Sequence, residues 1–325
     1  MIFLSPANAA RQLGVSAKAL RLYEERGLLT PGRTPAGWRA YGPAEMQRAE
    51  EIVALRALGF SLAQVSRVLA GDASGLEPAL AAHQSALEGR LRHLAAAIDR
   101  IRTLRADLAS GATPAVSDLT GLQAAPTIAF DLPWPWGGER FELRDIHPLT
   151  WLTGPLGSGK TKLAKRLAQE IPGAAFIGLD RVAPNSLSDR ASDTLAWLIE
   201  DGATDTPALR ALLAVLADET SGALVIDLIE QGLDEPTQLA LASHLRQRGP
   251  DARPLIAMAR STAMLDLAAC GLDEAIIFCP ANHSPPMIVM PHPGAPGYEA
   301  VATCLAPPDV RARTEGVIAF RPPAA

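Results

Sequence analysis

Cysteine is scarce in this chain, and no long apolar run is present. The cysteines, Cys270, Cys279 and Cys304, are odd in number and form no C-x-x-C pair, which argues against a disulfide framework and is typical of a reducing cytoplasm. No stretch of about 18 consecutive apolar residues occurs, so a membrane span is not expected. The N-terminal segment has no basic residues before its short apolar run, so a secretory signal is not expected either. We therefore predict a cytoplasmic protein without a membrane partner.

Lysine is also scarce, and charge is distributed unevenly along the chain. Of the four lysines, three lie within residues 160–165 and the fourth is Lys18. The net charge of −5 divides into +4 for residues 1–110 and −9 for residues 111–325. A basic N-terminal part on an acidic body indicates nucleic-acid binding by the N-terminal part. With 325 residues, 48% of them hydrophobic, the chain is long enough for two domains or more.

Helix-capping residues divide the start of the chain into short helices. Ser5 and Pro6 predict a helix that ends at Gly14, because serine caps the first turn and proline fits its first position. Ser16 predicts a second helix that ends at Gly27, a residue suited to a left-handed C-cap. Two short helices joined by so short a link are typical of a helix-turn-helix, whose second helix enters the DNA major groove.

A wing and two further helices complete this part of the chain. Residues 31–42 are too rich in proline and glycine for a helix and predict a small wing. Pro43 opens a third helix, and Ser61 with Gln64 forms a capping box that starts a fourth. The sequence therefore predicts a winged helix-turn-helix DNA-binding domain over residues 1–72.

This part resembles the MerR family of bacterial transcription regulators. The matching segments are "LRLYEERGLL" (20–29), "GWRAY" (37–41) and "LRALGFSLAQV" (55–65), in the family's order and spacing. The resemblance implies a dimer that binds double-stranded promoter DNA and distorts an over-long promoter spacer. It also implies RNA polymerase as a partner and an effector that changes the distortion.

The resemblance assigns DNA contacts to four side chains. Two lie on the recognition helix and two in the wing, where they grip backbone phosphates: Lys18, Arg21, Arg39 and Tyr41. The family usually has tyrosine where Trp38 stands and often where Leu22 stands. These two departures are compatible with docking on DNA, and they affect which DNA sequence the protein prefers.

Residues 76–109 predict one long helix that pairs with a second copy of the chain. Apolar residues recur along it at coiled-coil spacing: Leu87, Leu91, Leu94, Ile98, Ile101 and Leu108. A lone amphipathic helix of this length needs a partner to bury its stripe. The resemblance implies antiparallel pairing across the axis of a homodimer. Metal-sensing relatives carry cysteines near the end of this helix, whereas the first cysteine here is Cys270. Residues 110–126 predict a linker.

A predicted phosphate-binding loop, residues 154–161, lies near the start of the last part of the chain, residues 127–325. The apolar strand "PLTWLTG" enters the pattern G-x-x-x-x-G-K-T, and a helical pattern follows, which is the expected context of this loop. Backbone amides at the helix N-terminus bind phosphates, a lysine supplies charge, and a hydroxyl binds Mg²⁺. Asp227, at the end of the strand "ALVIDL", is the second predicted Mg²⁺ ligand. The predicted nucleotide-binding residues are Gly154, Gly157, Ser158, Gly159, Lys160 and Thr161.

This last part resembles the ABC-type ATPases, an α/β fold with a parallel sheet. The matching segments surround the loop and Asp227, but the Leu-Ser-Gly-Gly-Gln signature is absent. Leu228 stands where the family has its catalytic glutamate, and Arg260 lies where the switch histidine is expected. We expect a degenerate domain that holds nucleotide and is at most a weak ATPase, with Glu230 as the candidate catalytic carboxylate.

ATP is the predicted nucleotide, with Mg²⁺, because no lysine follows Lys165 to form a guanine-specific Asn-Lys-x-Asp motif. Trp134 or Trp136 either stacks on adenine or covers the edge of the sheet. The sequence thus predicts a multidomain, homodimeric regulator: an all-α winged helix-turn-helix, a coiled-coil helix and an α/β P-loop domain that senses ATP. The alternative is an active ATPase or small-molecule kinase whose DNA-binding head controls its own expression.

Overall fold

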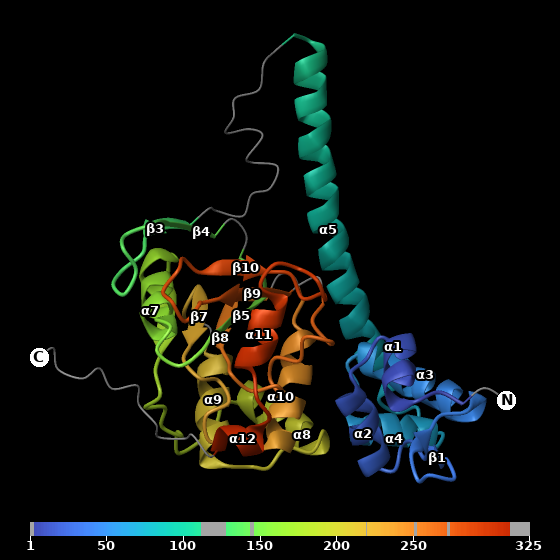
Figure 1. The fold of residues 1–325 in the computed structure, drawn as a ribbon. Helices are drawn as coiled ribbons and strands as arrows, with labels where there is room; N and C mark the ends of the chain where they lie inside the picture. Colours follow the sequence, from blue (N-terminus) through green and yellow to red (C-terminus); the bar gives the residue numbers. More distant parts are fainter. Residues whose placement is uncertain are drawn as a thin grey trace, which may run out of the picture.

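A computed structural model shows an N-terminal helical unit, one long helix and a C-terminal α/β unit in chain order (Figure 1). The structure describes residues 3–111, 128–143, 146–218, 220–249, 252–271 and 274–312. Most of the linker predicted at 110–126 therefore lies outside the described residues.

The helices of the N-terminal unit begin at side-chain caps. The Ser16 Oγ accepts a hydrogen bond from the amide of Ala19 at 3.1 Å. Ser61 and Gln64 exchange two bonds of 3.2 and 2.7 Å, which is the predicted capping box. These bonds satisfy amides that have no partner inside the helix. The elements are α1 (Pro6–Leu13), α2 (Ala17–Glu25), β1 (Gly32–Arg33), β2 (Arg39–Ala40), α3 (Pro43–Ala57) and α4 (Leu62–Leu69).

One apolar core holds the wing hairpin against these helices. Leu20 of α2, Ile52 of α3 and Phe60 are buried in it. Tyr41 follows β2, forms an antiparallel bridge with Leu4 and is fully buried in the same core. The wing is therefore anchored by the residue directly after its second strand.

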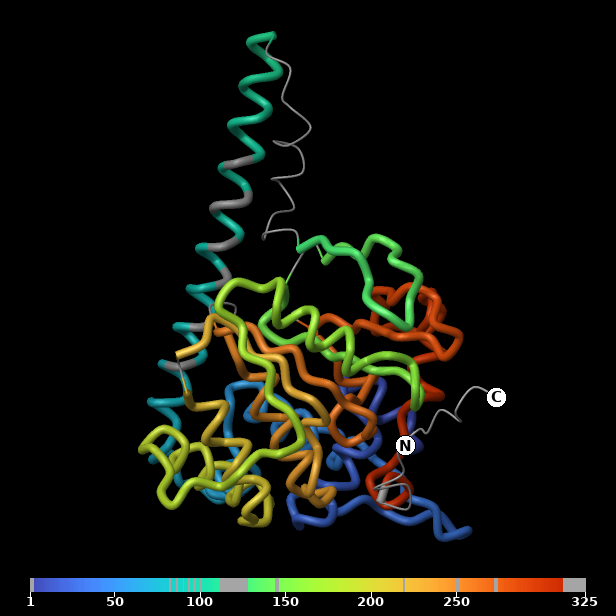
Figure 2. The backbone as a smooth tube through the Cα atoms, turned by 90° about the vertical axis from the view of Figure 1, so that its left-hand side faces the viewer, coloured from blue at the N-terminus to red at the C-terminus, as the bar shows by residue number. Residues whose placement is uncertain are grey.

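Helix α5 (Leu76–Ala109) extends away from both units as a rod (Figure 1 and Figure 2). Apolar side chains are exposed along it: Leu87, Leu91, Leu94, Ile98, Ile101 and Leu108. A single helix cannot bury such a stripe by itself, so the stripe favours a partner. Within the described ranges, α5 included, every helix is too short or too polar to span a bilayer.

Six strands form the sheet of the C-terminal unit in the order β10-β9-β5-β8-β7-β6. Neighbouring strands pair in parallel except β10 and β9, which are antiparallel. Every residue of β5, β7 and β8 is buried, as expected for strands covered on both faces. The predicted mostly parallel sheet is confirmed. Its strands are β5 (Leu149–Thr153), β6 (Ala174–Ile177), β7 (Ala223–Ile226), β8 (Leu255–Met258), β9 (Glu274–Phe278) and β10 (Met287–Val289).

Helices cover both faces of this sheet. Leu152 packs with Leu163 of α7 and with the hairpin β3–β4 on one face. Its neighbour Trp151 packs with Leu198 and Leu241 on the opposite face, because successive strand residues point to opposite sides. The remaining elements are β3 (Ile128–Asp131), β4 (Arg140–Leu143), α7 (Lys160–Glu170), α8 (Asp189–Glu200), α9 (Pro207–Ala217), α10 (Glu235–Arg246), α11 (Tyr298–Cys304) and α12 (Pro308–Ala312).

Candidate functional site

The predicted phosphate-binding loop lies at the carboxyl end of β5 and leads directly into α7. Gly154 and Gly159 have φ angles of 150° and 91°, in the region that favours glycine. A Cβ on Gly159 would lie 2.7 Å from the indole of Trp136, and a Cβ on Gly154 would collide with the carbonyl oxygen of Cys279. The loop therefore requires glycine at both positions, for conformation and for space.

The ammonium group of Lys160 is held inside this loop. Its Nζ donates to the carbonyl oxygen of Pro155 at 2.6 Å and lies 3.4 Å from the Ser158 Oγ. Burial lowers the pKa of Lys160 to about 8, and the positive charge of Arg260 acts in the same direction. An anionic phosphate beside Lys160 would oppose both effects, because a nearby negative charge favours the protonated amine.

Thr161, the next residue of α7, meets Asp227 at the carboxyl end of β7. The Thr161 Oγ1 donates to the Asp227 Oδ2 at 3.1 Å, although β8 lies between β5 and β7 in the sheet. Burial raises the pKa of Asp227, whereas the bond from Thr161 and the charge of Lys160 lower it. A hydroxyl and a carboxylate at this distance are oxygen ligands of the kind that Mg²⁺ binds. The two predicted ligands therefore fit the ion.

Glu230 is hydrogen-bonded to the backbone after β8. Its Oε1 accepts a hydrogen bond from the amide of Arg260 at 2.7 Å, and its Oε2 is buried without a hydrogen-bond partner. Burial raises the pKa of this carboxyl, while the Arg260 amide and charge oppose the rise. Burial and the bond to the Arg260 amide favour a structural role for Glu230, and its catalytic role stays a prediction.

Two arginines at this edge of the sheet were not among the site residues predicted from the sequence. Arg181 follows β6 and donates to the carbonyl oxygens of Asp227 and Leu228 at 3.3 and 2.9 Å. Arg260 follows β8, and its Nε is buried without a hydrogen-bond partner. Both residues come after the carboxyl ends of parallel strands, where α/β sheets bind ligands. That position is the signal in the sequence that could have identified them.

The two tryptophans before the loop occupy different environments. Trp136 is buried against Gly159, and its Nε1 donates to the carbonyl oxygen of Ser284 at 3.1 Å. Trp134 is 65% exposed. Trp136 therefore supports the loop, and stacking of Trp134 on adenine stays a prediction.

The recognition helix α2 is joined to the C-terminal unit. The Lys18 Nζ donates to the Thr262 Oγ1 at 2.7 Å. Arg21, one turn further along α2, is exposed, and its Nε lies 3.8 Å from a carboxylate oxygen of Glu25. Of the two predicted DNA contacts on this helix, Lys18 is thus engaged within the chain, while Arg21 is accessible.

The wing places its two predicted DNA contacts differently. Arg39 is partly exposed and pairs with Glu24 of α2, and this hydrogen bond raises the pKa of Arg39. Tyr41 is fully buried, its hydroxyl has no hydrogen-bond partner, and burial raises its pKa. The predicted phosphate contact of Tyr41 is contradicted by this burial: its ring is part of the helix-turn-helix core.

Asp201, directly after α8, connects the two units. Its carboxylate accepts bonds from Arg56 at 2.6 and 2.9 Å and from the amide of Leu62 at 2.7 Å. The Arg56 guanidinium also lies 5.7 Å from the ring centroid of Trp197, whose Nε1 donates to the carbonyl oxygen of Gly59 at 3.3 Å. The contact between the units is therefore buried and charge-assisted.

Comparisons with known proteins find a matching family and several relatives. The family described as MerR HTH family regulatory protein matches residues 4–72. The nodulation protein NolA of Bradyrhizobium elkanii is 34% identical over 187 residues, which cover 51% of this chain and 81% of that protein. The chain belongs to the MerR HTH family. The assignment to the MerR family made from the sequence is thereby confirmed, and the resemblance of the last part to ABC-type ATPases stays a prediction.

Two further similarities cover shorter shares of the chain. The NolA protein of Bradyrhizobium sp. (strain NC92) is 37% identical over 95 residues, which cover 29% of this chain and about 40% of that relative's length. The structure of HiNmlR, a MerR family regulator lacking the sensor domain and bound to promoter DNA, is 25% identical. It covers 34% of this chain and 92% of that chain, with a TM-score of 0.26. The P-loop interpretation of the α/β unit stays a prediction.

Proposed function

We propose that this protein is a homodimeric MerR-type transcription regulator that binds promoter DNA and responds to ATP and Mg²⁺ through its α/β unit. The observation that carries the proposal is the hydrogen bond from Lys18 to Thr262. It joins the recognition helix to the segment after β8, two residues beyond Arg260, whose charge acts on Lys160. A nucleotide that moves this segment would thus act on the recognition helix.

The DNA-binding half of the proposal is supported by family membership and by charge. Residues 1–110 carry a net charge of +4 in a chain of −5. Arg21 is exposed on the recognition helix and Arg39 is partly exposed in the wing. Arginines in these places suit phosphate contacts, which supply much of the affinity for DNA and make it depend on salt.

The nucleotide-binding half is supported by the loop and by Asp227. The loop requires its glycines, Lys160 is held at its centre, and Thr161 meets Asp227 at 3.1 Å. Bound Mg²⁺ would neutralise phosphate charge beside Thr161 and Asp227. Lys160 would exchange its bond to a loop carbonyl for a charge-assisted bond to a phosphate oxygen.

Slow hydrolysis is the expected behaviour. Leu228 occupies the position after Asp227 and provides no carboxylate, and Glu230 is bonded to the backbone of Arg260. No other residue of the described chain takes over this role in the contacts around Asp227. The alternative of an active ATPase or small-molecule kinase therefore has less support than a nucleotide sensor.

Arg260 provides the route from nucleotide to DNA. Its buried Nε has no hydrogen-bond partner, so a terminal phosphate beside Lys160 would attract its guanidinium. A shift of residues 260–262 would break the bond between Thr262 and Lys18 and free the recognition helix. Such a switch needs only a few kcal/mol of difference in nucleotide affinity between the two states.

The test measures the DNA affinity of the full-length protein with and without ATP and Mg²⁺. The probe is a duplex that the wild type enriches from a random-sequence pool. We expect ATP to raise the affinity for this duplex. Lys160→Ala should lower ATP affinity at least tenfold, about 1.4 kcal/mol, abolish the response to ATP, and leave DNA affinity without ATP unchanged.

Thr262→Val tests the route itself, because it removes the oxygen that accepts the bond from Lys18 while keeping a similar volume. We expect its DNA affinity without ATP to rise to the level of the ATP-bound wild type. Thr303→Val, at an exposed threonine of α11, is the matched control and should behave like the wild type. If the DNA affinity of the wild type is the same with and without ATP, the proposal of an ATP sensor is refuted. Turnover near one ATP per second would favour the enzyme.

A further inference from the structure

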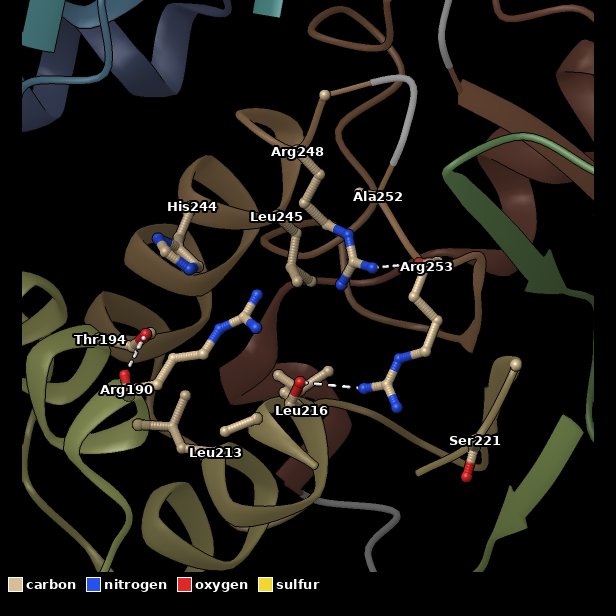
Figure 3. Close-up of a pocket in the computed structure, with 13 residues that line it drawn as sticks. Arg190, Thr194, Leu213, Leu216, Ser221, His244, Leu245, Arg248, Ala252 and Arg253 are labelled. Carbon is tan, nitrogen blue, oxygen red and sulfur yellow. Dashed lines mark hydrogen bonds between the residues drawn. The ribbon is translucent and has the colours of Figure 1, made fainter. Parts of the chain in front are cut away.

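A cavity of about 560 Å³ is drawn with its lining residues in Figure 3. It lies at the end of the sheet opposite to the predicted phosphate-binding loop. Ser221 and Arg253 line it, and they precede the amino ends of β7 and β8. Gly154 and Asp227 follow the carboxyl ends of β5 and β7. Because these strands are parallel, the two regions lie at opposite ends of the same sheet. The cavity is therefore separate from the proposed nucleotide site.

Positive charge gathers in this cavity. Arg190 of α8, Arg248 after α10 and Arg253 before β8 line it, and Figure 3 shows their guanidinium groups around the same space. Among the described residues that line it, none is a carboxylate. Burial lowers the pKa of Arg248 to about 10, and the charges of Arg253 and Arg190 act in the same direction. An anion in the cavity would relieve this repulsion.

Two buried nitrogen atoms at the cavity have no hydrogen-bond partner: the Arg248 Nε and the His244 Nδ1. Burial lowers the pKa of His244 to about 4, with the charges of Arg248 and Arg190 adding to the effect. The imidazole is therefore neutral near pH 7, and a neutral imidazole can donate one N–H. Buried donors without partners cost free energy, which an oxygen acceptor on a ligand would recover.

Bonds within the chain hold the arginines in position. Arg253 donates to the carbonyl oxygen of Leu216 at 3.0 Å and to that of Asp218. Arg248 donates to the carbonyl oxygen of Arg253. Side chains that are already ordered lose little entropy when a ligand binds. Apolar side chains form another part of the wall: Leu213, Leu216, Ala217 and Leu245.

We propose that this cavity binds a small organic anion, in which a carboxylate or phosphate group is carried on an apolar body. The anionic oxygens accept hydrogen bonds from Arg248 and His244, and the apolar body covers the leucines of α9. The volume lies in the range of small-molecule sites, whose lining combines apolar walls with a few polar groups. An inorganic anion alone would leave the apolar wall uncovered.

The helices around this cavity also hold the DNA-binding unit. The ring centroids of His244 and Trp197 lie 5.2 Å apart, and the Trp197 Nε1 donates to the carbonyl oxygen of Gly59. Helix α8 carries Arg190 at the cavity and leads to Asp201 at the contact between the units. A ligand that moves His244 therefore acts on the contact that holds the DNA-binding unit. This regulatory step rests on the proposed function, whereas ligand binding does not.

Calorimetric titration of the full-length protein tests the site, with benzoate, phenyl phosphate and inorganic phosphate as probes. Each is titrated into the wild type and into Lys160→Ala, so that binding at the phosphate loop is recognised. We expect benzoate, phenyl phosphate or both to bind at least tenfold more tightly than inorganic phosphate, and equally well to Lys160→Ala. Arg248→Gln should weaken this binding at least tenfold. Arg140→Gln, at an exposed arginine of β4, is the matched control and should not.

A second variant, Ala217→Phe, tests the same site in case Arg248→Gln does not fold. Ala217→Phe fills the cavity without changing its charge, and should abolish binding while the melting temperature stays near that of the wild type. The site is refuted if neither organic probe binds, if inorganic phosphate binds as tightly as they do, or if a folded Ala217→Phe binds them like the wild type. DNA affinity with and without the bound probe then tests the regulatory step, and an unchanged affinity refutes that step alone.

Discussion

Replacement of Asp201 by asparagine tests the buried contact between the DNA-binding unit and the α/β unit. The Asp201 side chain is 1% exposed and accepts bonds from Arg56 and from the amide of Leu62. An amide in its place has no charge and one acceptor oxygen. Breaking a buried ion pair costs about 3–5 kcal/mol. Arg56 keeps its bonds to the carbonyl oxygen of Phe60 and to Ser243, so we expect the lower end, about 3 kcal/mol.

Urea unfolding followed by tryptophan fluorescence measures this loss. Asp205→Asn is the matched control, because Asp205 also pairs with an arginine, Arg210, at 2.6 Å, but is 36% exposed. Exposed pairs contribute less than about 1 kcal/mol, so the control should stay close to the wild type. A loss of about 3 kcal/mol corresponds to a shift of more than about 100-fold in the docking of the two units. Asp201→Asn should therefore also raise DNA affinity in the absence of ATP.

Equal losses in the two variants would refute this reasoning, because they would show that burial of Asp201 adds nothing. A large loss of stability with unchanged DNA affinity would separate the two claims. In that case Asp201 would stabilise the chain without restraining the recognition helix.

Three further predictions follow from the DNA-binding face, the long helix and the cavity. Arg21→Ala should weaken binding to specific and non-specific DNA together and lower the salt slope by about 1; gel shifts that show the wild-type slope would remove Arg21 from the DNA contacts. Replacing Leu94 and Ile98 with aspartate should split the proposed homodimer, because buried carboxylates find no partner in an apolar seam; a dimer that persists in sedimentation would place the interface elsewhere. Stability should fall as the pH is lowered from 6.5 toward about 4, because His244 has a pKa of about 4 when folded against 6.5 ordinarily, so the unfolded chain binds the proton first. The loss reaches about 3 kcal/mol, and a His244→Gln variant with the same pH dependence would contradict this origin.

Two predicted site residues have buried side-chain oxygens in the structure. The wing motif around Tyr41 does not show whether the tyrosine is exposed or buried. Its burial depends on the bridge to Leu4 and on the helix core. Glu230 lies three residues after Asp227, and the direction of its side chain is decided where the chain leaves β7. Its carboxylate there meets the amide of Arg260, which comes from another strand. Neither environment can be derived from neighbouring residues alone.

The sequence by itself determined the parts of this protein whose signals lie within a few residues. Ser16, Ser61 and Gln64 cap their own helices, and the positive φ angles in the predicted phosphate-binding loop favour glycine. The pairing of Thr161 with Asp227 was also predictable, because the carboxyl ends of parallel strands share one edge.

Only the tertiary structure decided how the two units meet and what else they can bind. Arg56 and Asp201 are 145 positions apart in the chain, and Lys18 and Thr262 are 244 apart. Arg190, Arg248 and Arg253 come from separate elements and gather at one cavity. Arg56, Asp201 and the three cavity arginines would each look like an ordinary surface charge in their own segments. Their partners are chosen by packing of the whole chain, since burial and electrostatic strength depend on the surroundings that the fold supplies.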